Sequence, residues 1–321
     1  MKVEDSMIHF IKQYKQQKIL LAISGGQDSI LLIKSLDNLK NYSINKKIRI
    51  TYIYIDHQWK NNSNKQIKHL INYLKSKNNE IIIYQINKIT LSEKECRQYR
   101  YNIIIQYAIS NKYQLIITGH NLTDKIETFI NNISRSSHIE SFNSLSITNK
   151  IHKNIFFFRP LLNVGREHIY WMCKKMYLPI WSDTTNYMYE IPRNRVRQEL
   201  IPYMKKYLNR NVEKNMKCLL TNYQYENDYI KQNTIKLYLK SIHHSKVAIK
   251  YNKFKMQNFI LQIRIIQLFC FHNFQEYLEN KKVTQIIEII NKPFMQSTKK
   301  IEERYFILFI NKYWIYLGLK S

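Results

Sequence analysis

The chain has 321 residues, 45% of them hydrophobic, which is enough for one large domain or two smaller ones. Lysine and arginine number 51 against 23 aspartates and glutamates, so the net charge is +28 and indicates a polyanionic partner: nucleic acid first, an anionic membrane surface second. The four cysteines form no C-x-x-C pair and no run reaches 18 apolar residues, which argues against a zinc ribbon, an iron–sulfur site, a disulfide framework and a transmembrane helix.

The composition also hints at the genome. Isoleucine, lysine, asparagine and tyrosine are abundant and only three alanines occur, as AT-rich coding favours, and this bias accounts for part of the charge. We therefore expect a plastid-encoded protein of the chloroplast stroma, with a bacterial cytoplasm as the alternative. The scattered cysteines fit a reducing compartment. The first 18 residues predict a short helix and no signal or transit peptide.

Short isoleucine-rich runs alternate with helical patterns through the first half of the chain. The runs are nearly continuous in apolar character, as strands covered on both faces are. Strands are predicted at 18–23, 48–55, 80–86 and 114–119, and helices near 29–40, 64–77, 92–110 and after 123. This alternation predicts an α/β domain with a parallel sheet over residues 1–208.

From residue 209 the pattern changes. Long helices are predicted at 212–240 and 255–277, a shorter helix at 281–291, and a hairpin that turns at Asn311-Lys312. Residues 209–321 are therefore predicted to form a smaller, mainly helical α+β domain.

The string "SGGQDS", residues 24–29, lies between the first strand and the first long helix. Two glycines let the backbone turn sharply and approach a ligand, and the following helix points its free N–H groups into the turn. Ser24 and Ser29 add hydroxyl donors. The segment is therefore suited to a phosphate or pyrophosphate at the carboxyl end of a strand. It is neither a Walker loop nor a dinucleotide fingerprint, and the alternative is a tight turn without a ligand.

This Ser-Gly-Gly-x-Asp-Ser string resembles the PP-loop of the ATP pyrophosphatase superfamily, whose fold is adenine nucleotide alpha hydrolase-like. Further strings resemble, in order and spacing, the tRNA(Ile)-lysidine synthetase family. They are "IDHQWKNNS" (55–63), "EKECRQYRYN" (93–102), "TGHNLTDKIETFINNISR" (118–135), "RPLL" (159–162) followed by Arg166, "LPIWSDTTN" (178–186) and "PRNRVRQELIP" (192–202). The resemblance covers residues 18–205, and the remainder resembles the family's shorter members in size and position only.

The resemblance implies a carbon–nitrogen ligase that modifies tRNA in two steps. ATP adenylates the C2 oxygen of the cytidine at the first anticodon position of a CAU tRNA(Ile), releasing pyrophosphate. The ε-amine of L-lysine then attacks C2 and expels AMP. The product, lysidine, converts decoding from AUG to AUA.

The cofactor-binding residues follow from the same match. The residues expected to hold the β- and γ-phosphates of ATP are Ser24, Gly25, Gly26, Gln27, Asp28 and Ser29. Asp28 is the expected ligand of Mg²⁺, and this ion would neutralise charge on the leaving pyrophosphate. Asp56, His57 and Gly119, at the ends of strands, are expected to line the nucleotide site.

Among the expected catalytic residues, His120, Asp124 and Glu127 follow the fourth strand at spacings i, i+4 and i+7. A carboxylate here would hold the lysine ammonium and accept its proton. The alternative is that both carboxylates only favour a helix N-terminus and that the histidine is a structural one.

Two pairs of arginines complete the set. Arg97 and Arg100 are three apart on one helical face and would stabilise negative charge on phosphate or the adenylated base, unless they form a solvated face. Arg193 and Arg197, with Asn194 between them, would clamp RNA phosphate or close over the site.

The chain departs from the family pattern after His120, where Asn121 and Thr123 replace a second histidine and a first aspartate, and Lys125 replaces a glutamine. Asp124, Glu127 and the loop are spared, so an active enzyme is expected.

The expected partners are tRNA(Ile) and lysine, with no membrane; a homodimer is one option for the oligomeric state. Lysines and tyrosines over 236–255 suit a tRNA surface, although composition alone would also supply them. The other readings left open are another PP-loop enzyme, a non-catalytic tRNA-binding relative and a peripheral membrane protein.

Overall fold

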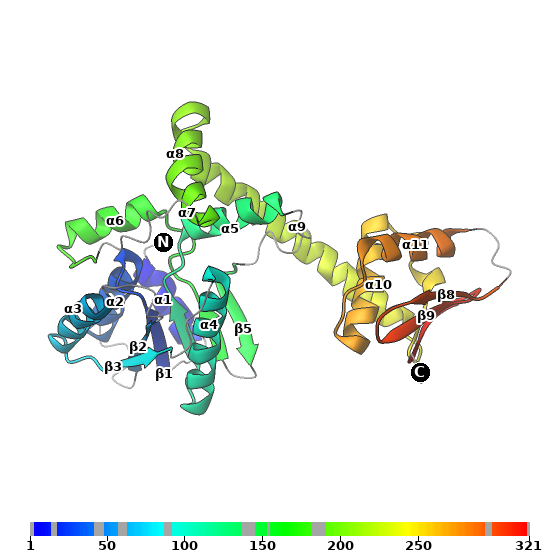
Figure 1. The fold of residues 1–321 in the computed structure, drawn as a ribbon, viewed down its shortest axis with the longest axis horizontal. Coiled ribbons are helices and arrows are strands. Elements are labelled where there is room, and N and C mark those ends of the chain that lie inside the picture. The colour runs from blue at the N-terminus through cyan, green and yellow to red at the C-terminus, as the bar shows by residue number, and fades with distance from the viewer. Residues whose placement is uncertain are drawn as a thin grey trace. The chain divides into compact units, whose positions relative to one another are not determined.

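The computed structural model describes residues 3–13, 18–41, 48–56, 63–86, 92–135, 145–152, 155–181, 191–292 and 297–319. The chain forms two compact units, Met1–Leu220 and Thr221–Ser321, called here the N-terminal and C-terminal units (Figure 1). The division falls inside helix α9 (Val212–Ser241), later than the boundary at 208/209 that the sequence suggests. None of the described helices combines the length and apolar character needed to cross a bilayer.

The N-terminal unit contains a six-stranded sheet in the order β3-β2-β1-β4-β6-β5. Its strands are β1 (Lys18–Ile23), β2 (Arg49–Asp56), β3 (Ile81–Gln85), β4 (Leu115–Thr118), β5 (Thr148–His152) and β6 (Ile155–Phe158). All neighbours pair in parallel except β5, which runs antiparallel to β6 at the edge. The predicted α/β class with a parallel sheet is therefore confirmed, while β5 and β6 were not anticipated.

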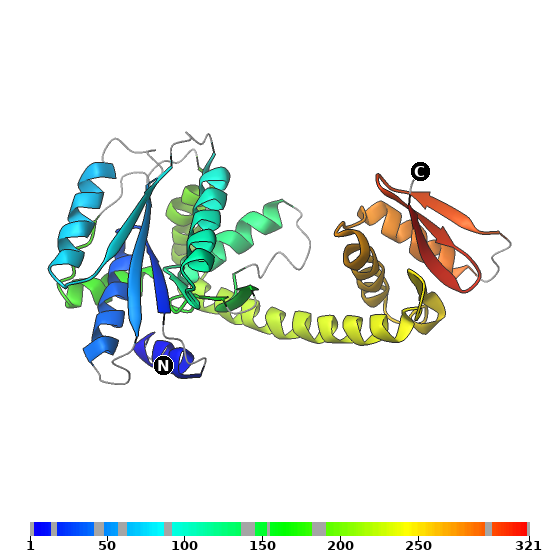
Figure 2. The same ribbon diagram turned by 90° about the horizontal axis from the view of Figure 1, so that it is seen from below.

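Helices cover both faces of this sheet, as the continuous apolar strands require. They are α1 (Val3–Gln13), α2 (Gln27–Asn41), α3 (Ser63–Lys75), α4 (Glu93–Ser110), α5 (Leu122–Ser134) and α6 (Arg166–Lys175). Within β1, Leu21 packs in the core on the side of α1, α2, α3 and α6, whereas Leu20 packs in the core on the side of α4. Figure 2 shows α4 across the sheet from α2 and α3.

A segment of irregular helix follows, made of α7 (Pro192–Arg195), α8 (Ile201–Tyr203) and two π-helical stretches, Val196–Leu200 and Met204–Leu208. Val196 and Ile201 pack against Leu122 and Ile126 of α5. This apolar contact places the arginines of α7 and of the first π-helical stretch over α5.

The C-terminal unit combines helices with a four-stranded antiparallel sheet, in agreement with the predicted α+β character. It contains the end of α9, α10 (Phe259–Phe274), α11 (Asn280–Asn291), a 3₁₀ turn (Tyr251–Lys253), and the strands β7 (Ala248–Lys250), β8 (Lys299–Glu302), β9 (Phe306–Ile310) and β10 (Trp314–Leu319). The predicted hairpin is β9–β10, where the Asn311 side chain accepts the N–H groups of Tyr313 and Trp314.

The turn from β1 into α2 is tightly constrained. Gly25 has a φ of +79°, a conformation that side chains disfavour, and a Cβ there would lie 3.0 Å from Gln66 Nε2 and 3.2 Å from Leu70 Cδ1. Gln66 Nε2 donates a hydrogen bond of 2.6 Å to the carbonyl oxygen of Ser24. The helix starts at Gln27, two residues earlier than predicted.

We expect Gly25→Ala to lower the free energy of unfolding by about 1–2 kcal/mol. A residue with a Cβ disfavours the positive φ at this position, and the Cβ would also lie too close to α3. Gly26→Ala is the matched control, since its Cβ would meet nothing nearer than Ser24 Oγ at 3.9 Å. Thermal unfolding of the two variants measures the difference; equal losses would show that the turn is not constrained as described.

Candidate active site

The βα turn is held in shape by its two serines. Ser29 Oγ accepts the N–H of Ser24 at 2.9 Å and lies 3.1 Å from Ser24 Oγ. The first N–H groups of a helix have no acceptor within it, so the start of α2 offers backbone donors to an anion. Gly119, directly after β4, allows a close approach here, because a Cβ at that position would lie 3.2 Å from Asp28 Cβ. The turn therefore has the geometry of a phosphate cradle.

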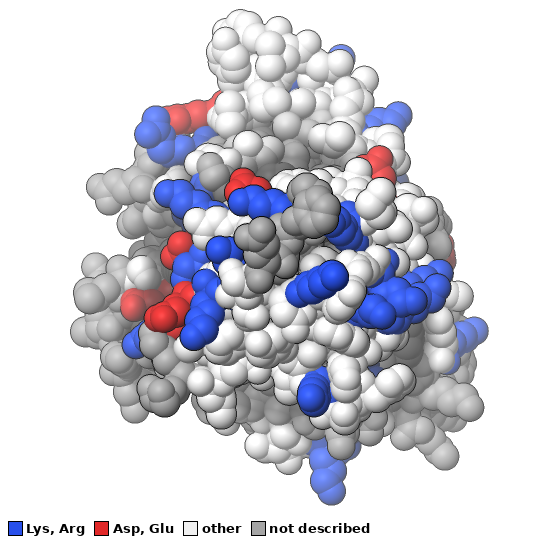
Figure 3. All heavy atoms as spheres, turned by 90° about the vertical axis from the view of Figure 1, so that its right-hand side faces the viewer, with Lys and Arg blue, Asp and Glu red and all other residues white. Residues whose placement is uncertain are grey.

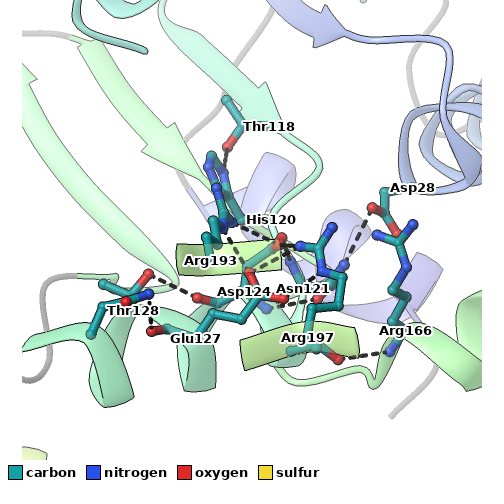
Figure 4. Close-up of polar contacts among 12 residues, drawn as sticks. Asp28, Thr118, His120, Asn121, Asp124, Glu127, Thr128, Arg166, Arg193 and Arg197 are labelled. Atoms are coloured by element: carbon teal, nitrogen blue, oxygen red, sulfur yellow. Dashed lines mark hydrogen bonds and ion pairs between the residues drawn. The ribbon is translucent and has the colours of Figure 1, made fainter. Parts of the chain in front are cut away.

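Asp28 stands in the first turn of α2 with its two oxygens in different surroundings. Oδ2 accepts a hydrogen bond of 3.2 Å from Asn121 Nδ2. Oδ1 is closed to solvent and has no hydrogen-bond partner among the described residues. Burial and the neighbouring Asp124 raise the pKa of Asp28 to about 6, although Arg166 acts in the opposite direction. Arg166, at the start of α6, extends toward this carboxylate (Figure 4).

A buried carboxylate oxygen without a donor suits a cation. Among the described residues there is no group of three or more His, Cys, Asp or Glu side chains that could hold a metal ion by themselves. Mg²⁺ commonly takes only one or two protein carboxylates and completes its shell with waters and substrate phosphates. Asp28 beside a phosphate cradle fits that mode of binding.

His120 follows β4 and is held at both ring nitrogens. Nδ1 lies 3.0 Å from Thr118 Oγ1, and Nε2 lies 3.1 Å from the Tyr101 hydroxyl. Burial lowers the pKa of His120 to about 3, and Arg97 and Arg100 of α4 act in the same direction. The imidazole is therefore neutral at physiological pH, where it can donate or accept a hydrogen bond without carrying charge.

Asp124 belongs both to a helix cap and to an ion cluster. Asn121 is the N-cap of α5: its side chain accepts the N–H of Asp124, and Asp124 Oδ2 accepts the N–H of Asn121, each at 3.0 Å. This capping box agrees with the alternative given for Asp124, that it favours a helix N-terminus. The other carboxylate oxygen of Asp124, Oδ1, faces Arg193 and Arg197, each with a nitrogen 2.8 Å away.

Glu127 lies one helical turn further along α5 and is fully buried. Arg193 Nε donates to its Oε2 at 2.6 Å, and Arg197 Nε donates to its Oε1 at 2.5 Å (Figure 4). Two carboxylates thus meet two guanidinium groups in a closed cluster. The sequence reading, in which Arg193 and Arg197 clamp RNA phosphate or close over the site, did not anticipate this pairing.

The two carboxylates of the cluster differ as proton acceptors. Burial raises the pKa of Asp124, but Arg193 and Arg197 outweigh it and hold the value at about 2. For Glu127, burial and the charge of Asp124 prevail over the arginines and raise the pKa. Glu127 is therefore the stronger base of the pair.

Other residues that the sequence assigned to the site are Asp56, Gln27, His57 and Arg97. Asp56 ends β2 and is buried. Gln27 donates from Nε2 to the carbonyl oxygen of Arg166 at 3.1 Å, so its side chain fixes the start of α6. His57 lies outside the described residues. Arg97 stands over the Tyr101 ring, 5.8 Å from its centroid.

Sequence reasoning assigned no role to Arg166 or to the surface beside it. A pocket of about 970 Å³ opens between α6 and the irregular helix. Its lining includes Thr123, the bases Arg166, Arg197, Lys205, Lys206 and Arg210, and the acids Glu167 and Glu213. Thr123, which replaces a family aspartate, donates to Glu213 Oε1 at 3.0 Å. The clustering of basic residues over 193–210 was the available signal for this cationic pocket.

We expect Arg197→Gln to destabilise the N-terminal unit by about 3–5 kcal/mol, because it leaves Glu127 buried with one cation fewer. Arg195→Gln, two residues away, removes only an exposed pair with Glu199 and should change stability by less than about 0.5 kcal/mol. Chemical denaturation compares the two; a similar small loss for both would mean that the cluster is not closed as drawn.

A second prediction concerns Asp28 in the absence of nucleotide and metal. Its folded-state pKa lies above the usual value of 3.8, so the carboxylate destabilises the fold increasingly as pH rises from about 4 to 6. Asp28→Asn should therefore raise the free energy of unfolding at pH 8 by up to about 3 kcal/mol, measured as a higher melting temperature, and have little effect at pH 4. A gain that is the same at both pH values would contradict this origin.

Comparison with known proteins gives a consistent result. A family model described as a PP-loop domain matches residues 1–204. The tRNA(Ile)-lysidine synthase, chloroplastic, of Gracilaria tenuistipitata var. liui is 43% identical over 291 residues, which are 89% of this chain and 91% of that protein. The protein of the same name from Pyropia yezoensis is 32% identical over 303 residues, covering 94% and 90%.

Among solved structures, the U34-tRNA thiolase NcsA from Methanococcus maripaludis aligns with 68% of this chain and 80% of its own, with a TM-score of 0.52 and 16% identity, which shows a shared fold alone. The matched PP-loop domain contains the phosphate cradle, Asp28 and the carboxylates of α5. The chain belongs to the tRNA(Ile)-lysidine synthase family of PP-loop enzymes.

Proposed function

We propose that this chain ligates L-lysine to C2 of the cytidine at the first anticodon position of a CAU tRNA(Ile), through an adenylated tRNA. The observation that carries the proposal is the shared location of three features. A phosphate cradle, the unpartnered Oδ1 of Asp28 and the buried carboxylates of α5 all lie at the carboxyl edge of one parallel sheet. The relatives named above share this family and support the substrate assignment.

In the first step, the C2 oxygen of the cytidine attacks the α-phosphorus of ATP. An O–P bond forms, the bond from the α-phosphorus to the bridging oxygen breaks, and pyrophosphate leaves. The N–H groups at the start of α2 and the Ser24 and Ser29 hydroxyls would bind the β- and γ-phosphates. Asp28 Oδ1 would hold Mg²⁺, which supplies positive charge for the leaving pyrophosphate.

Neighbouring groups would position the nucleotide and the base. Asp56 and Gly119 lie at the ends of β2 and β4, where open α/β sheets bind ligands. His120, whose two ring nitrogens contact Thr118 and Tyr101, would line the site as a neutral ring and add no charge to it. Arg97 and Arg100, close enough to lower the pKa of His120, provide cations for the adenylated intermediate.

In the second step, the ε-nitrogen of lysine attacks C2, the C2–O bond breaks and AMP leaves. The ε-ammonium must first lose a proton. Glu127 would accept it more readily than Asp124, because the pKa of Glu127 is raised and that of Asp124 is lowered. An incoming ammonium carries the same charge as the guanidinium of Arg193 or Arg197, so we expect lysine to displace one of them from the carboxylates. The released arginine can then face phosphate, as the sequence reading expected.

We propose that the chain acts in the plastid stroma, with a bacterial cytoplasm as the alternative. The names of the two relatives include the word chloroplastic, and the AT-rich composition agrees with a plastid genome, which supports the proposal.

The test combines the chain with ATP, Mg²⁺, radiolabelled lysine and a CAU tRNA(Ile) transcript. Label should pass to the tRNA only when ATP is present. Asp28→Ala should reduce transfer at least about 100-fold, the range for removing one electrostatic contact of a transition state, while tRNA binding persists. Asp228→Ala, an exposed acid of α9, is the control.

The other readings appear as distinct outcomes. Binding of tRNA without transfer would indicate a non-catalytic relative. ATP–pyrophosphate exchange with a small molecule and no tRNA would indicate another PP-loop enzyme. Either result contradicts the proposal.

A further inference from the structure

The C-terminal sheet has one face that the helices of its own unit do not cover. Ile249, Leu308, Ile310 and Ile315 point into the core formed with α10 and α11. Because side chains alternate along a strand, Phe309, Trp314 and Tyr316 belong to the opposite face. Figure 2 shows the sheet on one side of the unit with α10 and α11 on the other.

Aromatic rings gather on this outer face. Phe309 and Tyr316 are directly opposite each other in the β9–β10 register, and their rings stack with centroids 5.1 Å apart and planes 10° from parallel. Gly318 makes room for this pair, since a Cβ at 318 would lie 2.9 Å from the Phe309 ring. Trp314 lies two residues before Tyr316 on the same strand, and His243 packs edge-on against it at 5.0 Å. All three rings are only half-buried.

Cationic groups flank these rings. Lys300 of β8 lies opposite Phe309, with Nζ 5.6 Å from the ring centroid. Lys250 of β7 lies opposite Trp314, with Nζ 5.9 Å from that ring. The acid on this face of β8 is Glu302 at the sheet edge. Figure 3 shows one face of the molecule, on which lysine and arginine side chains are spread with fewer aspartates and glutamates among them.

The combination of aromatic rings and lysines on this face indicates which kind of polyanion would bind it. A duplex hides its bases and offers mainly phosphate, so it would use the lysines alone. Unpaired nucleotides offer both phosphate and a base plane that stacks on an aromatic ring. An acidic protein or an anionic bilayer has the charge but no comparable stack of planes. A pair of central strands that carry rings, flanked on each side by a strand that carries a lysine, therefore favours single-stranded RNA.

We propose that the outer face of the C-terminal sheet binds unpaired nucleotides of RNA, with bases stacked on Trp314 and on the Phe309–Tyr316 pair, and phosphates contacted by Lys250 and Lys300. The inference deepens the proposed function, on which it rests for the identity of the RNA as tRNA. The surface belongs to the C-terminal unit and the residues proposed for lysine transfer to the N-terminal unit, so the two proposals can be tested independently.

The test measures binding of the full chain to a fluorescently labelled single-stranded RNA of about 12 nucleotides, a length within the range that single-strand-binding folds cover, and to the matching duplex. No ATP or lysine is present. Trp314→Leu and Tyr316→Leu should each raise the Kd for the single strand roughly tenfold, in the lower range for one stacked base, and leave the duplex Kd unchanged. Tyr277→Leu removes an exposed tyrosine of the same unit outside the sheet and should have no effect.

A second measurement addresses the lysines and does not depend on core packing. Lys250→Gln combined with Lys300→Gln should make the log–log salt dependence of single-strand binding shallower by roughly 0.7 per lysine. Melting temperatures confirm that each variant is folded. Unchanged single-strand affinity in the folded ring variants, or an equal loss for single strand and duplex, would overturn the proposal.

Discussion

The balance of charge at the carboxyl edge of the sheet is the constraint on which the N-terminal unit depends. Carboxylates withdrawn from water cost several kcal/mol each unless cations and hydrogen bonds compensate them. The carboxylates are Asp28, Asp124 and Glu127, and the nearby guanidinium groups belong to Arg166, Arg193 and Arg197. The arginines come from α6, α7 and the first π-helical stretch, so segments late in the unit are fastened to the α2 and α5 elements that form its site.

The negative charges of these carboxylates are balanced to different degrees, and the difference bears on function. Asp124 receives nitrogens of both Arg193 and Arg197, and its pKa is low. Asp28 receives one amide hydrogen bond on Oδ2, while Oδ1 finds no donor among the described side chains, and its pKa is raised. The fold thus tolerates a poorly compensated charge at one point, beside the phosphate cradle, where a metal bound to a substrate phosphate would complete the balance. Enzymes commonly have residues at a binding site that lower the stability of the fold but serve the activity.

How far the sequence could lead depended on the kind of signal. The strands β1, β2 and β4 are apolar runs that are mostly buried, and β3, at the edge of the sheet, is apolar in sequence although half-buried to exposed. Gly25 follows the first of these strands, so the parallel sheet and its turn could be predicted. In contrast, β5 is a polar edge strand of sequence TNKIH and β8 is KKIE, and neither has the alternation or apolar content that marks a strand. The contact between Arg193 and Glu127 joins residues 66 positions apart, and one sequence carries no information on such a pairing. The capping box at Asn121 is a local feature whose Asn-x-x-Asp spacing is visible in the sequence, and the helix N-terminus given as the alternative role of Asp124 agrees with it.

The function proposed for the N-terminal unit depends on where the triphosphate of ATP binds. A crystal structure of the chain with Mg²⁺ and a non-hydrolysable ATP analogue is the most direct measurement. It should show the β- and γ-phosphates on the backbone N–H groups at the start of α2, with the metal about 2.1 Å from Asp28 Oδ1. A triphosphate held elsewhere in the unit, with Asp28 Oδ1 still without a ligand, would contradict the central claim.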